Sequence, residues 1–118
     1  MTSGRRARSQ RGMVTVELAI GVLTAALLTV CLAGLSLLGV AQAAAGESSA
    51  QIARQTARGD DAAVELARER VPDGAAVEVS QESDGVRVAV VVPVAVPLLG
   101  RFTVSADSWA AYEPGVGP

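Results

Sequence analysis

Histidine and lysine are absent from the 118 residues, cysteine occurs once, and aromatic residues make up only 3% of the chain. A chain without histidine cannot form a Ser-His-Asp triad or a histidine-liganded metal site from its own residues. The single cysteine, Cys31, excludes an internal disulfide and a metal site built from several cysteines. No other group of polar residues has the spacing of a catalytic site. The sequence therefore predicts a protein that is not an enzyme and that uses neither a metal nor a cofactor.

Negative charge is missing from the start of the chain. Residues 1–12 contain four arginines and no acid, whereas residues 13–118 contain six arginines and twelve acids. This asymmetry makes the distal part acidic and argues against a nucleic-acid partner. Because basic residues beside a membrane segment stay on the cytoplasmic side, it also predicts an N-terminus inside and a C-terminal part outside. We expect residues 1–12 themselves to lack regular structure.

A long apolar run follows the basic segment. No charged residue occurs between Leu18 and Gly46. A helix of about 20 apolar residues crosses the ~30 Å hydrocarbon core of a bilayer, so the run predicts one transmembrane helix with its span at about residues 18–40. Cys31 lies inside this run, either as a small apolar residue at a helix contact or, alternatively, as a lipidation site.

Helical periodicity continues beyond the apolar run. Small residues recur on one side of residues 47–58, and Gly59 has the identity typical of a residue that follows a helix C-terminus. The first helix is therefore expected to run from about Val14 to Arg58, on the order of 65 Å at 1.5 Å per residue. Since this is about twice the bilayer core, its distal half is expected to project into water.

A short second helix is expected after Gly59. Asp60 or Asp61 can act as its N-cap, and the Pro-Asp-Gly segment at residues 72–74 ends it. Its acidic side chains are expected to form a solvated face rather than a catalytic cluster. The apolar side of this helix is formed by Ala63, Val64, Ala67 and Val71, and the acids are Asp60, Asp61, Glu65 and Glu69.

Alternating valines predict strands in the remaining residues. A first strand at about residues 77–79, a turn at 83–85, a strand over 86–92 and a last strand at about 102–112 form a small antiparallel meander. Trp109 and Tyr112 are expected in its core. The expected fold class is thus α+β: a long N-terminal helix, a short second helix and a three-stranded meander that must pack against the helices, because three strands alone are marginally stable.

The start of the apolar run contains the motif that bears most on function. Gly12 ends the basic segment, Met13 follows, and Glu17 is the fifth residue after the glycine. Two kinds of targeting signal fit this region. A conventional signal peptide would be cut after Ala43, although its apolar region would have membrane-spanning length. The alternative is a class III signal, in which cleavage follows Gly12.

The segment R-G-M-V-T-V-E at residues 11–17 resembles the class III signal of type IV prepilins, although Met13 stands where phenylalanine is more usual. Together with V-S-A-x-S-W-A-A-Y-E-P at residues 104–114, it makes the whole chain resemble the TadE-like minor pilins of tight-adherence (Tad) systems, in particular short forms from high-GC Gram-positive bacteria. A paired cysteine of some longer members is absent here.

The resemblance implies a structural and assembly subunit, a minor pilin or pseudopilin, of a Tad-type type IV pilus used in adhesion or secretion. It implies a basic prepilin leader at residues 1–12, a spine helix at 13–59 and an extracytoplasmic domain at 60–118. The implied partners are a prepilin peptidase, which cuts between Gly12 and Met13, other pilin subunits and the Tad assembly platform. The implied location is the cytoplasmic membrane and then an extracellular pilus.

The alternative function is a small secreted or membrane-anchored binding domain, released after a conventional signal peptide ending at Ala43. The position of cleavage separates the two functions.

Glu17 is an acid at the edge of a membrane-spanning run, where an ionisable group is costly. Cleavage after Gly12 would create a cationic amine on Met13, one helical turn from the Glu17 carboxylate. The two groups, on the same or a neighbouring helix, can neutralise each other, and a helix N-terminus also favours an anion. We therefore expect Glu17 to act in assembly. The other interpretation is that it simply lies at the level of the lipid headgroups.

Small residues recur at every fourth position within the run. Such a stripe lets two helix backbones approach closely, which favours helix packing in a membrane. The other interpretation is chance, because alanine and glycine are abundant in this chain. The stripe consists of Gly21, Ala25, Thr29 and Ala33.

Overall fold

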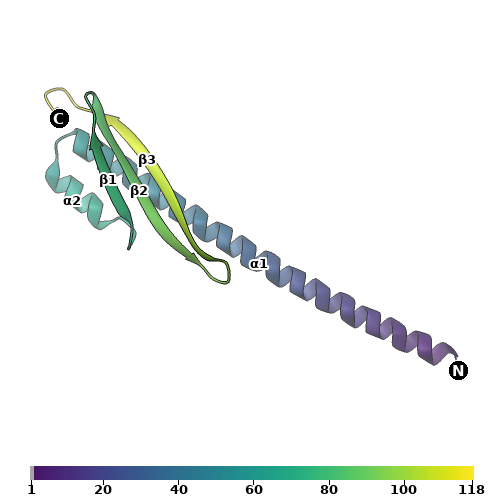
Figure 1. Ribbon diagram of the computed structural model, residues 1–118. Coiled ribbons are helices and arrows are strands. Elements are labelled where there is room, and N and C mark those ends of the chain that lie inside the picture. The colour runs from purple at the N-terminus through teal and green to yellow at the C-terminus, as the bar shows by residue number, and fades with distance from the viewer. Residues whose placement is uncertain (1) are drawn as a thin grey trace. The chain divides into compact units, whose positions relative to one another are not determined.

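A computed structural model describes the backbone of residues 2–118 and the side chains of residues 9–118. It has the α+β layout expected from the sequence: a long helix, a short helix and a three-stranded antiparallel sheet. The chain divides into two compact units, Met1–Gly34 and Leu35–Pro118. The elements, shown in Figure 1, are α1 (Thr2–Ala57), α2 (Asp61–Glu69), β1 (Ala76–Gln81), β2 (Gly85–Val96) and β3 (Gly100–Ala111).

The N-terminal end of α1 differs from the expectation. The helix begins at Thr2 rather than near Val14, so the prediction that the leader lacks regular structure is wrong for residues 2–12; Met1 lies outside the described residues. The segment contains no proline and is rich in arginine, with alanine and glutamine. These residues are good helix formers, so a helix nucleated in the apolar run extends backwards through them.

The C-terminal end of α1 is closed as the sequence predicted. Gly59 has a φ of +73°, which glycine adopts at little cost. Its N–H donates to the Thr56 carbonyl at 3.0 Å, and the Asp60 N–H donates to the Gln55 carbonyl at 3.1 Å. These bonds satisfy carbonyls that the last helical turn leaves free, so the chain can reverse direction directly after Ala57.

Asp60 also starts α2, as its position before the helix predicted. Its Oδ1 accepts a hydrogen bond from the Ala63 N–H at 3.1 Å, the geometry of an N-cap. Ala67 is buried in the core and Val71 packs against it, so the expected apolar side faces the interior. Asp61 and the other acids of this helix are exposed, as expected of a solvated face.

The sheet is a meander in the order β1-β2-β3, as the valine pattern predicted. β1 pairs with β2 from Ala76↔Val91 to Gln81↔Val86. β2 extends to Val96, beyond the predicted end of its strand at residue 92, and keeps pairing with β3 through Pro93. Proline is tolerated there because β1 pairs with β2 only as far as Val91. The missing N–H of Pro93 therefore costs no hydrogen bond on the β1 side.

The core lies in the Leu35–Pro118 unit, between the sheet and the two helices. Alternate residues of β2 face inward, since side chains along a strand point to opposite faces. Small residues of α1 meet them, which lets the helix approach the sheet closely. The buried apolar residues of this cluster are Val86, Val88, Val90 and Val92 from β2, Ala45, Ile52, Ala53 and Ala57 from α1, and Ala67 from α2.

The two aromatic residues near the C-terminus lie in different surroundings. Tyr112 packs against the core, as expected. Trp109 is 45% exposed, so its predicted place in the core is wrong. Its pairing with Arg87 puts it on the outer face, opposite Val86 and Val88. A Cβ on Gly85 would lie 2.6 Å from Trp109 Cζ2, so the indole covers the backbone of this glycine instead.

Candidate functional site

Gly12 and Met13, which are predicted to act in processing, lie beside Glu17, which is predicted to act in assembly. Gly12, Met13 and Glu17 border the same shallow stretch of helix surface, with Val16 and Ile20 between and beside them. This follows from helix geometry, because positions four apart lie one turn above each other. Nothing lies within 4 Å of where a Cβ of Gly12 would stand, so the backbone at this position is open to approach.

The Glu17 side chain is exposed, and across residues 9–118 it makes no ion pair or hydrogen bond. In the uncleaved chain Met13 has an ordinary amide nitrogen inside α1, which has no positive charge. A charge partner one turn away would appear only with a free amine at Met13. The predicted pair therefore remains a prediction about the cleaved chain.

The small-residue stripe continues directly from Glu17. Glu17, Gly21 and Ala25 border one further stretch of the helix surface. Thr29 Oγ1 donates to the Ala25 carbonyl at 2.8 Å, so its hydroxyl needs no partner from another molecule in apolar surroundings. All four stripe residues are exposed, the fourth being Ala33. The structure thus leaves the stripe open to a neighbouring helix, while its role as a contact remains a prediction.

The stretch of α1 between residues 9 and 29 is exposed on every side. By length and composition, α1 contains one segment able to cross a membrane. Free Cys31 is half-buried on the same helix. Leaving one large apolar side chain in water instead of burying it costs roughly 1.5–3 kcal/mol. The most exposed large side chains of this stretch are Met13, Val14, Leu18, Ile20, Val22, Leu23 and Leu27.

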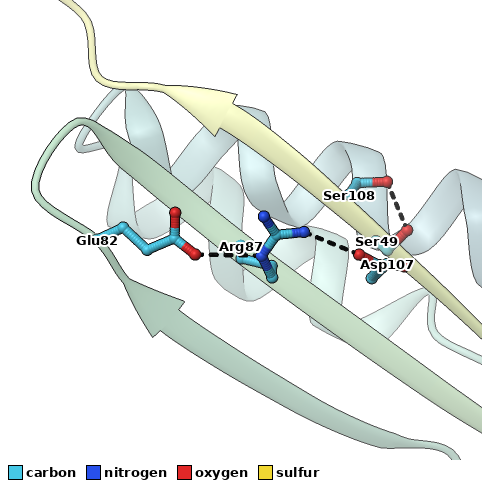
Figure 2. Close-up of polar contacts among 5 residues, drawn as sticks. All are labelled: Ser49, Glu82, Arg87, Asp107 and Ser108. Atoms are coloured by element: carbon cyan, nitrogen blue, oxygen red, sulfur yellow. Dashed lines mark hydrogen bonds and ion pairs between the residues drawn. The ribbon is translucent and has the colours of Figure 1, made fainter.

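Two polar contacts that sequence analysis missed fix α1 to β3. Ser49 is fully buried, and its Oγ lies 2.8 Å from the Ser108 Oγ (Figure 2). Gln42 Nε2 donates to the Ser105 carbonyl at 2.9 Å. A buried serine needs such a partner, because an unpaired buried hydroxyl is costly. The position of Ser49 among the small residues of α1 could have indicated its burial. The sequence did not indicate that Ser108 would be its partner.

Arg87 lies on the outer face of the sheet between two acids. Its Nε donates to Glu82 Oε1 at 3.1 Å and its Nη1 to Asp107 Oδ2 at 3.0 Å (Figure 2). These hydrogen bonds, the one to Glu82 first, raise the pKa of Arg87 above its ordinary value. All three side chains are substantially exposed, so the contacts link the β1–β2 turn, β2 and β3 without adding much stability. We assign them no chemical role.

Within residues 9–118, no group of three or more His, Cys, Asp or Glu side chains is placed to hold a metal ion. The chain was compared with models of known protein families, with curated proteins and with solved structures, and no match was found. The residue that stands out chemically is Glu17. It is an acid on an exposed apolar helix, close to the Gly12–Met13 bond, and its carboxylate has no charge partner within residues 9–118.

Proposed function

We propose that the chain is a TadE-like minor pilin or pseudopilin, a structural and assembly subunit of a Tad-type type IV pilus used in adhesion or secretion. In this proposal α1 inserts into the cytoplasmic membrane, and a prepilin peptidase cuts the chain after Gly12. The mature subunit then joins other pilins on the assembly platform. The observation that carries the proposal is the shared helix surface of Gly12, Met13 and Glu17 at the entry to an exposed apolar helix.

The exposure of α1 supports membrane insertion. The large apolar side chains from Met13 to Leu28 are all exposed among the residues whose side chains are described. A helix that is apolar all round is expected in lipid or among other helices. The basic segment before the run favours an N-terminus on the cytoplasmic side and a C-terminal domain outside. From that orientation the subunit can pass into an extracellular filament.

The position of Glu17 supports assembly. Once Met13 bears a free amine, carboxylate and amine lie one turn apart on the same surface, or can pair between adjacent helices. The pair would fix the depth at which a subunit enters a bundle of helices. The stripe at Gly21, Ala25, Thr29 and Ala33 lies beyond it and allows close approach of the neighbour.

Co-expression with a prepilin peptidase tests the proposal. We expect intact-mass measurement to show loss of residues 1–12 and a new N-terminus at Met13. Gly12→Phe should abolish this shortening, because a bulky side chain would occupy the open backbone at the cleavage site. Gly39→Phe is a matched control: Gly39 also lies on α1 with nothing within 4 Å of its Cβ position, so cleavage should persist.

A mature chain that begins at Ala44 would contradict the pilin proposal. It would instead support a small binding domain released after Ala43. That domain would keep the core residues Ala45 and Ile52 but lose Gln42 and its hydrogen bond to Ser105.

A further inference from the structure

The loop between β2 and β3 exposes large apolar side chains. Leu98 is 89% exposed, more than any other large hydrophobic residue between residues 9 and 118, and Leu99 is 50% exposed. Phe102, just inside β3, is 41% exposed. We call residues 97–102 the hairpin tip. Loops that face water are normally polar, so this composition requires a cause.

The backbone of the hairpin tip does not favour leucine at its most exposed position. The Leu99 N–H donates to the Val96 carbonyl at 3.2 Å, which closes a four-residue turn with Pro97 second and Leu98 third. Leu98 has a φ of +68°. This is the type II arrangement, whose third position favours glycine or asparagine. Leu98 therefore serves neither the turn nor the core, since its side chain is almost wholly exposed.

Strand pairing places the hairpin tip beyond the rest of the sheet. The pairing of β1 with β2 stops at Ala76↔Val91, because Ala76 is the first residue of β1. β2 and β3 continue to pair with each other as far as Val96↔Gly100. Figure 1 shows this two-stranded ribbon extending past β1 to the β2–β3 loop.

The hairpin tip lies level with the apolar run within the Leu35–Pro118 unit. α1 and β3 run in the same direction, because Gln42 bonds to Ser105 and Ser49 to Ser108. At about 3.3 Å per strand residue, Leu99 lies roughly 20 Å back from Ser105. Leu35 lies only about 10 Å back from Gln42 at 1.5 Å per helix residue. The tip thus reaches at least the level of Leu35, which is inside the predicted span.

Charged residues are nearly absent from the end of the unit that contains the hairpin tip. Residues 88–106 contain a single charged residue, Arg101, and residues 35–46 contain none. The other charged residues of the unit lie between 47 and 87 or at Asp107 and Glu113. An arginine beside apolar side chains is well suited to a membrane surface, because its stem lies among apolar groups while the guanidinium reaches lipid phosphates.

We propose that the hairpin tip dips into the outer surface of the bilayer that α1 spans. Leu98, Leu99 and Phe102 enter the acyl chains of the outer leaflet, and the Arg101 side chain reaches back so that its guanidinium binds lipid phosphate. The proposal rests on the membrane insertion of α1 in the proposed function. Moving this loop out of water leaves few backbone donors unpaired, because Pro97 has no N–H and that of Leu99 is bonded within the turn.

Lipid fits the hairpin tip better than a second copy of the chain. Three apolar side chains form a much smaller surface than the roughly 800 Å² per partner of a standard protein interface. Lipid requires no matching shape, and the chain's own helix brings the tip to its surface. Contact with a second copy is therefore an outcome to be excluded by experiment.

Single-cysteine labelling of the full-length chain tests the proposal. In a Cys31→Ala background, a spin label is attached after Leu98→Cys, after Ser83→Cys in the opposite β1–β2 turn, or after Leu27→Cys in the predicted span. Each protein is reconstituted in phosphatidylcholine–phosphatidylglycerol vesicles. We expect labels at positions 98 and 27 to collide mainly with oxygen, which partitions into lipid. The label at position 83 should collide mainly with a water-soluble nickel chelate.

The outcomes separate this inference from the proposed function. If the label at position 98 is as accessible to the nickel chelate as the label at position 83, while position 27 is protected, the proposed lipid contact of the hairpin tip is overturned and membrane insertion of α1 is not. Protection at position 98 that is lost on lipid dilution also overturns it, because contact between copies depends on protein density. A label at position 27 that meets the nickel chelate overturns membrane insertion, and this inference with it.

A second variant separates lipid contact from folding. Leu98→Gly suits the φ of +68°, so thermal unfolding should be unchanged or occur at a higher temperature. With the spin label attached after Leu99→Cys, Leu98→Gly should raise accessibility to the nickel chelate several-fold. An unchanged accessibility would show that Leu98 does not hold the tip in lipid.

Discussion

The two halves of α1 use apolar residues in opposite ways. From Met13 to Leu28, bulky apolar side chains cover the helix outside the stripe that contains Gly21 and Ala25, and all are exposed. Between residues 41 and 57, small residues and one isoleucine face the sheet, and the charged side chains face away. The same continuous helix therefore meets two surroundings. The size and distribution of the apolar side chains distinguish the two halves: a largely bulky surface on most sides suits lipid or a helix bundle, and a one-sided surface of small residues suits a sheet.

The largest expected effect is on assembly, where substitution of Glu17 in the first half of α1 should differ most from substitution of an acid in the second half. Glu17→Ala should still be inserted and cut after Gly12 but should fail to join partner pilins, because the buried Met13 amine would lack its counter-charge. Glu17→Asp, one methylene shorter, should be partly active. Crosslinking or co-purification with partner pilins, scored beside the cleavage state, measures this.

Glu47→Ala is the matched control for Glu17→Ala. Glu47 is an exposed acid on the other half of α1, and its one side-chain partner among residues 9–118 is Gln51, whose Nε2 donates to its carboxylate at 2.8 Å. We expect normal cleavage and assembly. Incorporation of Glu17→Ala at the wild-type level would mean that Glu17 is only an interfacial residue, and the stripe beginning at Gly21 would become the next docking candidate.

Two isoleucines of α1 sharpen the comparison in terms of stability. Ile52 is fully buried, whereas Ile20 is 61% exposed. Ile52→Ala should lower the free energy of unfolding by about 2–5 kcal/mol, since it removes buried methyl groups and leaves a cavity. Ile20→Ala should change it by less than ~0.5 kcal/mol. Denaturant titration of both full-length variants in the same detergent measures the difference, and equal effects would contradict the division of the helix.

The smallest expected effect concerns the contact between α1 and β3. Ser49→Ala should lower the free energy of unfolding by about 0.5–1.5 kcal/mol, because the Ser108 hydroxyl loses its partner. After Ser108→Ala, the same Ser49→Ala change should cost less. A double-mutant cycle measures this coupling, and strictly additive effects would show that the two hydroxyls do not stabilise each other.

Local chemistry made much of the fold predictable. The valines from Val86 to Val92 showed strand alternation, and Gly59 and Asp60 marked one helix end and the next helix start. These features depend on neighbours in the chain, so the sequence contains them. The exposure of Trp109 could also have been anticipated, because Val104 and Ala106 alternate with the polar Ser105 and Asp107 on the opposite face.

Other features depend on partners far along the chain. The extension of β2 through Pro93 is possible because its pairing with β1 stops at Ala76↔Val91. The buried Ser49 hydroxyl bonds to Ser108, far along the chain, as well as to the nearby Gly46 carbonyl. The helical leader depends on propagation from the apolar run, because its arginine, alanine and glutamine permit a helix but do not nucleate one. Of the candidate site, helix spacing alone predicted that Met13 and Glu17 lie one turn apart. The exposed hairpin tip at Leu98 was not predicted, because its position follows from strand register.

The contacts between α1 and β3 also set an order of events during synthesis. Sixty-three positions separate Gln42 from Ser105, and 59 separate Ser49 from Ser108. Such closures are late and slow, whereas the meander forms from local pairings. Translation makes α1 first, so the helix face around Ile52 has no partner until β2 and β3 have left the ribosome. Any membrane insertion of the first half of α1 can therefore precede folding of the domain, and a prematurely stopped chain would present a bare, aggregation-prone core face.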